Sequence, residues 1–122
     1  MQNIHAVLKQ YWGYDVFRPL QEDIIRSVLD GNDTLALLPT GGGKSLCFQV
    51  PAMAMDGICV VVSPLIALMK DQVHNLNKRD IAAVALFTGM TKREIDIALD
   101  NCVYGKIKFL YVSPERLLTE IF

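Results

Sequence analysis

The chain has 122 residues, 52% of them hydrophobic, which is enough for one hydrophobic core and too short for several domains. Twelve lysines and arginines against 13 aspartates and glutamates leave a formal net charge of -1, so any contact with DNA or RNA must depend on particular residues and not on a strongly basic surface. No apolar run is long enough to cross a membrane and the first residues do not resemble a signal peptide, so we expect a cytoplasmic protein without a membrane partner.

The first half of the chain predicts two helices, a strand and a third helix. Apolar spacing predicts helices over residues 4–12 and 19–30, the second with Pro19 at its first position. Residues 34–38 form a short apolar run without alternation, which is typical of a strand buried on both faces. A glycine-rich turn follows directly, and the next helix is expected to begin near Gly43.

The second half predicts three more strands. Residues 58–62 are a continuous apolar run, mostly of β-branched residues, so we expect another buried strand there. Residues 84–87 are a weaker candidate for a strand, and residues 107–112 are expected to form the last strand. Thr91 with Glu94 forms a capping box for a helix that ends near residue 102. Strands alternating with helices indicate an α/β fold with a parallel sheet and flanking helices.

A short sequence motif occurs twice, at the ends of two predicted strands. Val-Val-Val-Ser-Pro-Leu at residues 60–65 resembles Leu-Tyr-Val-Ser-Pro-Glu at residues 110–115. Each serine is expected to cap the following helix, with proline at the first helical position.

The cysteines and histidines favour no metal site. Cys47, Cys59 and Cys102 are odd in number, widely spaced and set in apolar runs, which predicts buried free thiols and a reducing compartment. His5 and His74 are isolated, so ordinary surface or core roles are expected for both.

The segment Thr40 to Ser45 has the chemistry of a phosphate-binding loop. Gly43-Lys44-Ser45 completes the pattern G-x-x-x-x-G-K-[ST], although Leu38 stands where its first glycine belongs. The segment still offers successive backbone N–H groups, a helix start, a lysine and a hydroxyl. A plain glycine turn is the alternative, but such a turn has no need of the lysine.

Reach and charge give each residue of the loop a role. Lys44 is expected to meet the β- and γ-phosphates of ATP, and Ser45 to ligate Mg²⁺ through its hydroxyl. The remaining residues bring the main chain close to the phosphates: Thr40, Gly41, Gly42 and Gly43.

Proteins that hydrolyse ATP at a phosphate-binding loop of this kind also need an acidic pair at the end of an apolar strand. Asp56 lies too close to the loop and has no second acid beside it, and Glu115 is separated from its strand by Ser-Pro. We therefore expect the chain to be part of a motor and to be inactive alone.

Four segments together resemble the RecQ family of superfamily 2 DNA helicases, in family order and across nearly the whole chain. They are residues 17–21, 39–47, 61–66 with 68–72, and 111–117. The resemblance implies a truncated P-loop NTPase (RecA-like) lobe from a 3′-to-5′ helicase that uses ATP and Mg²⁺ and acts on single-stranded DNA and duplex junctions. It also accounts for Leu38, because superfamily 2 loops tolerate another residue there.

The resemblance also implies roles for residues in adenine binding and DNA contact. By position, Tyr14 and Arg18 are implied to hold the faces of adenine, and Gln21 to read its edge, as a ring, a guanidinium plane and an amide can do. The two Ser-Pro turns, with Ser63, Pro64 and Ser113, are implied to contact the DNA strand. Simple helix capping is the alternative for the turns.

By domain, the resemblance divides the chain into residues 1–30, with the adenine motif, and residues 31–122, with the phosphate loop and Ser-Pro turns. The acidic motif and the second lobe are expected beyond Phe122, and a sheet cut in this way is expected to self-associate through its exposed edge. In a bacterium the protein is expected near the nucleoid. A nucleotide-binding regulatory module without hydrolysis and, less favoured, a small-molecule kinase are the alternatives.

Overall fold

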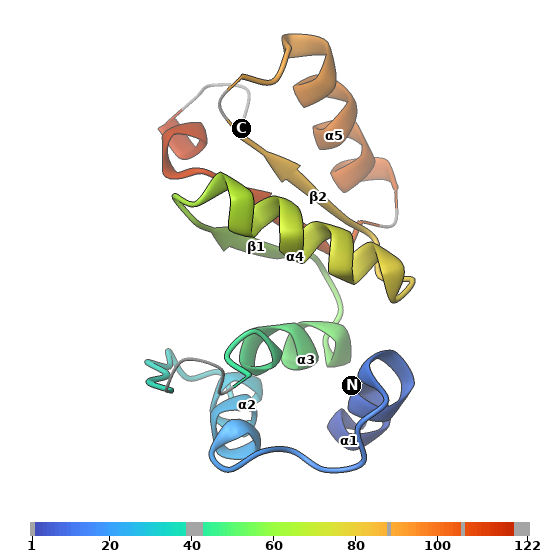
Figure 1. Ribbon diagram of the computed structural model, residues 1–122, viewed down its shortest axis with the longest axis vertical. Helices are drawn as coiled ribbons and strands as arrows, with labels where there is room; N and C mark the ends of the chain where they lie inside the picture. The colour runs from blue at the N-terminus through green and yellow to red at the C-terminus, as the bar shows by residue number, and fades with distance from the viewer. Residues whose placement is uncertain (1, 39–42, 88, 106, 119–122) are drawn as a thin grey trace. The chain divides into compact units, whose positions relative to one another are not determined.

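The computed structural model describes residues 2–38, 43–87, 89–105 and 107–118. The chain forms two compact units, Met1–Gly57 (the first unit) and Ile58–Phe122 (the second unit). Figure 1 shows that the first unit is helical and that the second contains the sheet. None of the helices within the described ranges has the length and apolar character needed to cross a membrane.

The first unit packs short helices around a small apolar core. Helix α1 (Ile4–Val7) continues into a π-helical turn, Leu8–Trp12, which confirms the first predicted helix. Helices α2 (Gln21–Leu29) and α3 (Leu46–Ala54) complete the unit. The buried apolar side chains that form this core are Ile4, Val7, Leu8, Ile25, Val50 and Ala54.

Helix α2 begins two residues later than the sequence predicts. Pro19 is not its first residue, because Leu20 adopts the left-handed conformation, with φ 72° and ψ -18°, and this conformation interrupts a right-handed helix. The backbone N–H of Gln21 donates to the carbonyl of Arg18 at 3.2 Å, which closes a tight turn before the helix. The prediction failed because leucine gives no sign of a positive φ.

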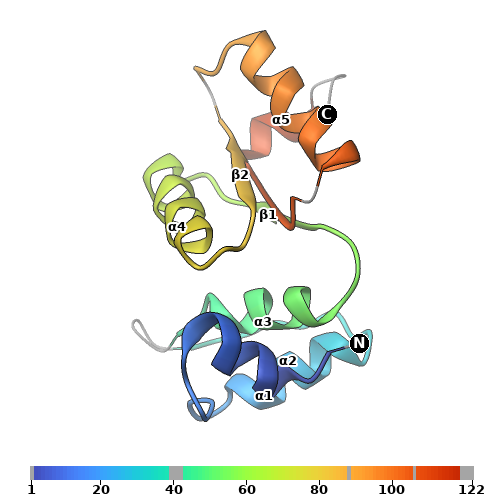
Figure 2. The same ribbon diagram turned by 90° about the vertical axis from the view of Figure 1, so that its right-hand side faces the viewer.

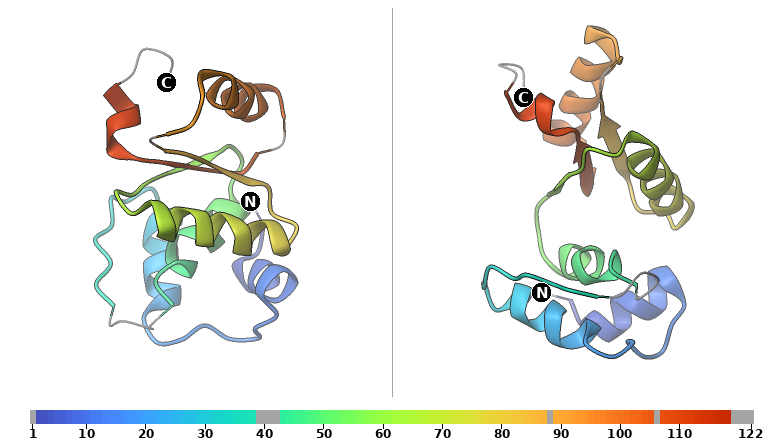
Figure 3. Two further views of the ribbon diagram at one scale, coloured as in Figure 1. Left: turned by 45° about the horizontal axis from the view of Figure 1, so that its top comes forward. Right: turned by 60° about the vertical axis from the view of Figure 1, so that its left-hand side comes forward.

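The strand predicted over residues 34–38 is wrong. Residues 32–38 have no regular secondary structure (Figure 3), and Leu35 and Leu37 are 85% and 79% exposed. A parallel strand needs hydrogen bonds from a neighbouring strand, and the regular elements in the described part of the first unit are all helices. The apolar pattern of residues 34–38 therefore does not by itself determine whether they form a strand.

The second unit confirms the parallel sheet. Strands β1 (Cys59–Val62), β2 (Ala83–Leu86) and β3 (Phe109–Val112) pair in the order β1-β3-β2, and both pairs are parallel. Leu110 lies opposite Val60 on one side and Val84 on the other. These are the three strands expected in the second half of the chain.

Helices α4 (Ile66–Lys78) and α5 (Lys92–Tyr104) lie on opposite faces of this sheet, as Figure 2 shows. The predicted capping box begins α5: Thr91 Oγ1 accepts from the N–H of Glu94 at 3.1 Å, and Glu94 Oε1 accepts from the N–H of Thr91 at 3.0 Å. The core on the α5 side consists of Leu86, Ile95, Ala98, Leu110 and Val112.

Strand β1 is not buried on both faces, contrary to the prediction. Val60 and Val62 are 46% and 49% exposed. The register places them on the same face as Leu110 and Val112, which pack against α5. Because β1 is an edge strand and α5 packs over β2 and β3, this strip of β1 remains exposed.

The two Ser-Pro segments begin their helices differently from the prediction. Helix α4 starts at Ile66, so Pro64 is not its first residue. The hydroxyl of Ser63 instead accepts from the N–H of Leu65 at 3.2 Å, which forms a tight turn ahead of the helix. Pro114 does begin its element, which is a 3₁₀ helix, Pro114–Leu118, in place of an α-helix.

Candidate nucleotide-binding site

The end of the predicted phosphate loop leads directly into α3. The N–H groups of Leu46 and Cys47 donate to the carbonyls of Gly43 and Lys44 at 3.3 Å and 3.1 Å. The helix therefore starts at Leu46, three residues later than the sequence predicts, and the amides of Leu46 and Cys47 are used within its first turn. The positive end of the helix dipole still faces the end of the predicted loop, which favours an anion there. Thr40, Gly41 and Gly42 lie outside the described residues.

Gly43 cannot be replaced by another residue without a change in the site. Its φ is +76°, in the left-handed region that favours glycine. A Cβ built on Gly43 also collides with Nε2 of Gln21. Both observations fit a loop whose main chain must come close to another group, as a phosphate cradle requires.

Gln21 joins the predicted adenine motif to the phosphate loop. Its side chain is buried, with 1% exposure. Oε1 accepts from the N–H of Arg18 at 2.8 Å, and Nε2 donates to the carbonyl of Gly43 at 3.1 Å. Two motifs that are 22 residues apart in the sequence therefore meet at one amide group.

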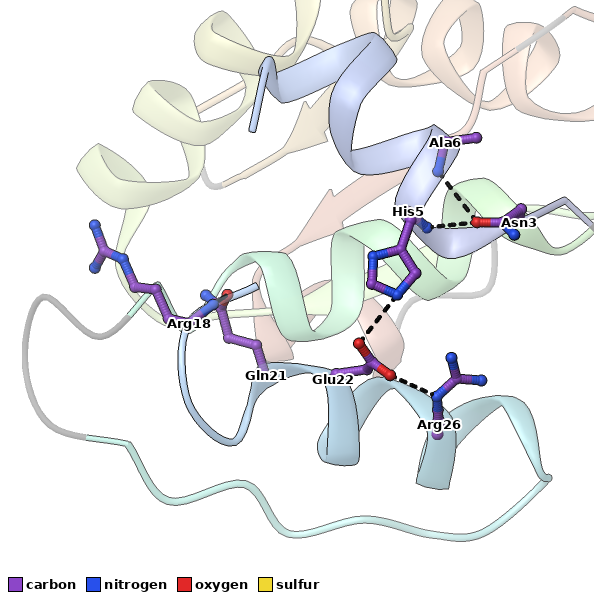
Figure 4. Close-up of polar contacts among 7 residues, drawn as sticks. All are labelled: Asn3, His5, Ala6, Arg18, Gln21, Glu22 and Arg26. Carbon is purple, nitrogen blue, oxygen red and sulfur yellow. Dashed lines mark hydrogen bonds and ion pairs between the residues drawn. The ribbon is translucent and has the colours of Figure 1, made fainter. Parts of the chain in front are cut away.

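The two residues predicted to hold the faces of adenine lie at the surface. Tyr14 is 53% exposed, and Arg18 is exposed with its guanidinium directed away from α2 (Figure 4). Lys44 is exposed and Ser45 is half-buried. The stacking role of Tyr14 and Arg18 stays a prediction.

A polar cluster that sequence reasoning missed lies beside the Arg18–Gln21 turn. His5 Nε2 lies 3.0 Å from Glu22 Oε1, and Arg26 Nε donates to Glu22 Oε2 at 3.0 Å (Figure 4). The hydrogen bond from Arg26 is the main reason that the pKa of Glu22 is lowered. The spacing of Glu22 and Arg26 on one helix face could have indicated their pair, but no local pattern indicates the contact of His5.

The carboxyl ends of the strands in the second unit bring the two predicted serines onto one edge of the sheet. The N–H of Ser63 donates to the carbonyl of Val112 at 3.0 Å, and the N–H of Ser113 donates to the carbonyl of Leu86 at 3.2 Å. Ser63 is half-buried, whereas Ser113 is only 3% exposed. The turn at Ser63 is therefore the more accessible of the two.

Two cationic side chains hold Phe87, which follows β2. The ammonium of Lys70 lies 4.6 Å from the centroid of its ring, and the guanidinium of Arg116 donates to its carbonyl at 3.1 Å. Lys70 thus has a cation–π contact and is not simply a solvated charge. Arg116 fixes the turn after β3 to the end of β2.

The cysteines are free thiols, as predicted. Cys47 is buried as predicted, whereas Cys59 and Cys102 are half-buried, so the prediction of burial is wrong for these two. Burial raises the pKa of each thiol, which disfavours the reactive thiolate. Within the described ranges, no group of three or more His, Cys, Asp or Glu side chains is placed to hold a metal ion.

Comparison with known proteins identifies relatives of the chain. The sequence model described as DEAD/DEAH box helicase matches residues 18–122. The chain is 44% identical to the ATP-dependent DNA helicase RecQ of Haemophilus influenzae over 117 residues, which are 96% of this chain and 19% of that protein. It is 44% identical to the ATP-dependent DNA helicase RecQ of Synechocystis over 119 residues, 98% of this chain and 25% of that protein.

A third relative is the probable ATP-dependent DNA helicase RecS of Bacillus subtilis, which is 45% identical over 118 residues, 96% of this chain and 23% of that protein. The chain therefore spans about a fifth to a quarter of the length of these curated relatives.

Proposed function

The chain belongs to the DEAD/DEAH box helicase family, and we propose that it is the nucleotide-binding part of a RecQ-like helicase that couples ATP hydrolysis to 3′-to-5′ unwinding of DNA. The names of the relatives support DNA as the substrate. Single strands and duplex junctions are the expected DNA structures. We expect the protein in the cytoplasm and, if it is bacterial, near the nucleoid. The relatives give no support to a regulatory module that lacks hydrolysis.

The hydrogen bond between Gln21 and Gly43 carries this proposal, because the side chain that we propose to read adenine lies against the end of the predicted phosphate loop. Lys44 would neutralise the β- and γ-phosphates, and the glycine backbone would approach them. Ser45 would supply a hydroxyl ligand to Mg²⁺. The bound ion would offset negative charge on the phosphates as ATP is hydrolysed.

Adenine recognition rests on three groups of different chemistry. Tyr14 and Arg18 would lie against the faces of the base, where an aromatic ring and a guanidinium plane both bind well. Gln21 would read the polar edge, because an amide both donates and accepts. Their position before the phosphate loop supports adenosine triphosphate as the nucleotide.

The Ser-Pro turns would contact the DNA backbone. A serine hydroxyl and the N–H groups at a turn bind phosphate oxygens irrespective of base sequence. This type of contact is compatible with a chain whose net charge is -1. Ser63 and Pro64 are the stronger candidates because Ser113 is buried.

The test is ATP hydrolysis by the complete polypeptide, measured with and without single-stranded DNA. We expect hydrolysis that DNA stimulates, and we expect Lys44→Ala to abolish it while most DNA binding is retained. ATP binding without turnover in the unaltered protein would favour the regulatory module. Full hydrolysis by Lys44→Ala would contradict the role of the lysine.

The isolated 122-residue chain is proposed to self-associate through β1. This strand is at the sheet edge and exposes Val60 and Val62 on one face. An unpaired strand edge beside exposed apolar side chains favours pairing with another strand. Size-exclusion chromatography with light scattering should show dimers or larger species, and a clean monomer at high concentration would contradict the proposal.

A further inference from the structure

His5 touches both sides of the turn that presents Gln21. Its ring packs edge-on against Phe17, with centroids 5.1 Å apart and an interplanar angle of 60°. Its Nε2 lies 3.0 Å from Oε1 of Glu22. Phe17 immediately precedes Arg18 and Glu22 immediately follows Gln21, so one imidazole contacts the two residues that flank the Arg18–Gln21 turn. Figure 4 shows the contact with Glu22.

This turn contains a strained residue and therefore needs support. Leu20 has a φ of 72°, a conformation that is unfavourable for a residue with a side chain by about 1–2 kcal/mol. Such a conformation persists only when surrounding contacts hold it. The hydrogen bond from the N–H of Arg18 to Gln21 supports the turn from within, and His5 supports it from outside.

His5 is itself held firmly enough to act as such a support. Asn3 caps α1, and its Oδ1 accepts from the N–H of His5 at 2.8 Å. The neighbouring Ile4 is 5% exposed and belongs to the core of the first unit. Glu22 is fixed on its other side by Arg26, so the carboxylate that meets His5 has a defined position.

We propose that His5 is a positioning residue for adenine recognition: it holds the Arg18–Gln21 turn in the conformation that directs the amide of Gln21 to Gly43. This inference rests on the proposed function, because it assumes that Gln21 reads the base. His5 does not need to touch the nucleotide. Its effect is on the preference for adenine and is transmitted through Phe17 and Glu22.

The experiment compares ATP and GTP binding to the complete polypeptide by calorimetry with Mg²⁺ present. His5→Ala should lower the affinity for ATP by about three- to tenfold, which corresponds to the loss of one hydrogen bond. The affinity for GTP should fall less, so the ratio of ATP affinity to GTP affinity should decrease. His5→Gln should restore most of the ratio, because its amide N–H can donate to Glu22.

Lys9→Ala is the matched control. Lys9 is on the π-helical turn that continues α1, and its ammonium pairs with Asp15 at 3.7 Å, with both side chains at least 75% exposed. Its removal should leave both affinities unchanged. Glu22→Gln, which weakens the same contact from the other side, should reproduce the change in ratio if His5→Ala proves too unstable to measure.

The outcomes separate this inference from the proposed function. Absence of ATP binding in the unaltered protein would remove the proposed function and this inference with it. ATP binding in the unaltered protein with an unchanged ATP-to-GTP ratio in both His5→Ala and Glu22→Gln would overturn the inference alone. An equal loss of affinity for ATP and GTP in His5→Ala, without recovery in His5→Gln, would show general damage to the first unit. This result would also overturn the inference.

Discussion

Replacement of Gly43 by alanine tests the geometry of the site most directly. Alanine at φ +76° is unfavourable by about 1–2 kcal/mol. The new Cβ also displaces Nε2 of Gln21, and the loss of a partner for a buried amide donor destabilises a protein by about 1–3 kcal/mol. Together these effects predict a loss of about 2–5 kcal/mol in the free energy of unfolding of the first unit.

Gly31→Ala is the matched control for backbone strain. Gly31 has a φ of +86°, and a Cβ built on it has no atom within 4 Å. Urea unfolding of the complete polypeptide should therefore show a loss of about 1–2 kcal/mol for Gly31→Ala, with unchanged ATP affinity. Gly43→Ala should show the larger loss together with weakened ATP binding.

The double variant isolates the contribution of Gln21. In a Gln21→Ala background no amide is left for the new Cβ to displace, so Gly43→Ala should then be no worse than Gly31→Ala. Non-additivity of this kind is expected for residues in contact. Equal effects of Gly43→Ala and Gly31→Ala in the unaltered background would refute a contact between Gly43 and Gln21, and so would a loss of stability from Gly43→Ala that is the same with and without Gln21.

The remaining predictions concern base reading, the capping box and DNA contact. Gln21→Ala should weaken ATP binding more than GTP binding in calorimetry, and an equal loss would exclude base reading. Thr91→Ala should lower the free energy of unfolding by about 1 kcal/mol. The backbone hydrogen bond from Thr91 lowers the pKa of Glu94 in the folded chain, so this stabilisation is complete above the unfolded pKa of about 4.3 and is lost as the pH falls through the folded value. Urea titrations from pH 6 to pH 3 should therefore show a smaller acid-induced loss of stability in Glu94→Gln, which has no carboxyl to titrate, than in the unaltered protein; Thr91→Ala keeps the backbone N–H that bonds Glu94 and should retain most of the pH dependence. Ser63→Ala should weaken single-stranded DNA by about three- to tenfold regardless of base sequence, measured by anisotropy at fixed salt; loss confined to particular sequences would contradict a backbone contact.

The sequence predicted best those elements whose signals are local. The strands of the second unit were visible as β-branched and apolar runs, and the capping box at Thr91 and Glu94 depends on residues three positions apart. The parallel arrangement followed from the alternation of strands with helices. Each of these features needs only neighbouring residues or the order of elements along the chain.

Features that depend on distant or absent neighbours were not predictable. The apolar run with Leu35 and Leu37 has the pattern of a buried strand, yet it has no strand to pair with in the described part of the first unit. The exposure of Val60 depends on where α5 lies, which its own segment cannot reveal. The positive φ of Leu20 has no signal in the residues beside it, and the contact of His5 with Glu22 joins separate helices.

The amide of Gln21 makes base and phosphate recognition interdependent under the proposed function. Its oxygen accepts from the N–H of Arg18 and its nitrogen donates to the carbonyl of Gly43. A base read by the same amide must share or displace these bonds, so the energy of base binding includes the energy of the contact with the loop. Binding free energies are reciprocal: if adenine favours one position of Gln21, the loop conformation that favours this position must strengthen adenine binding by the same factor.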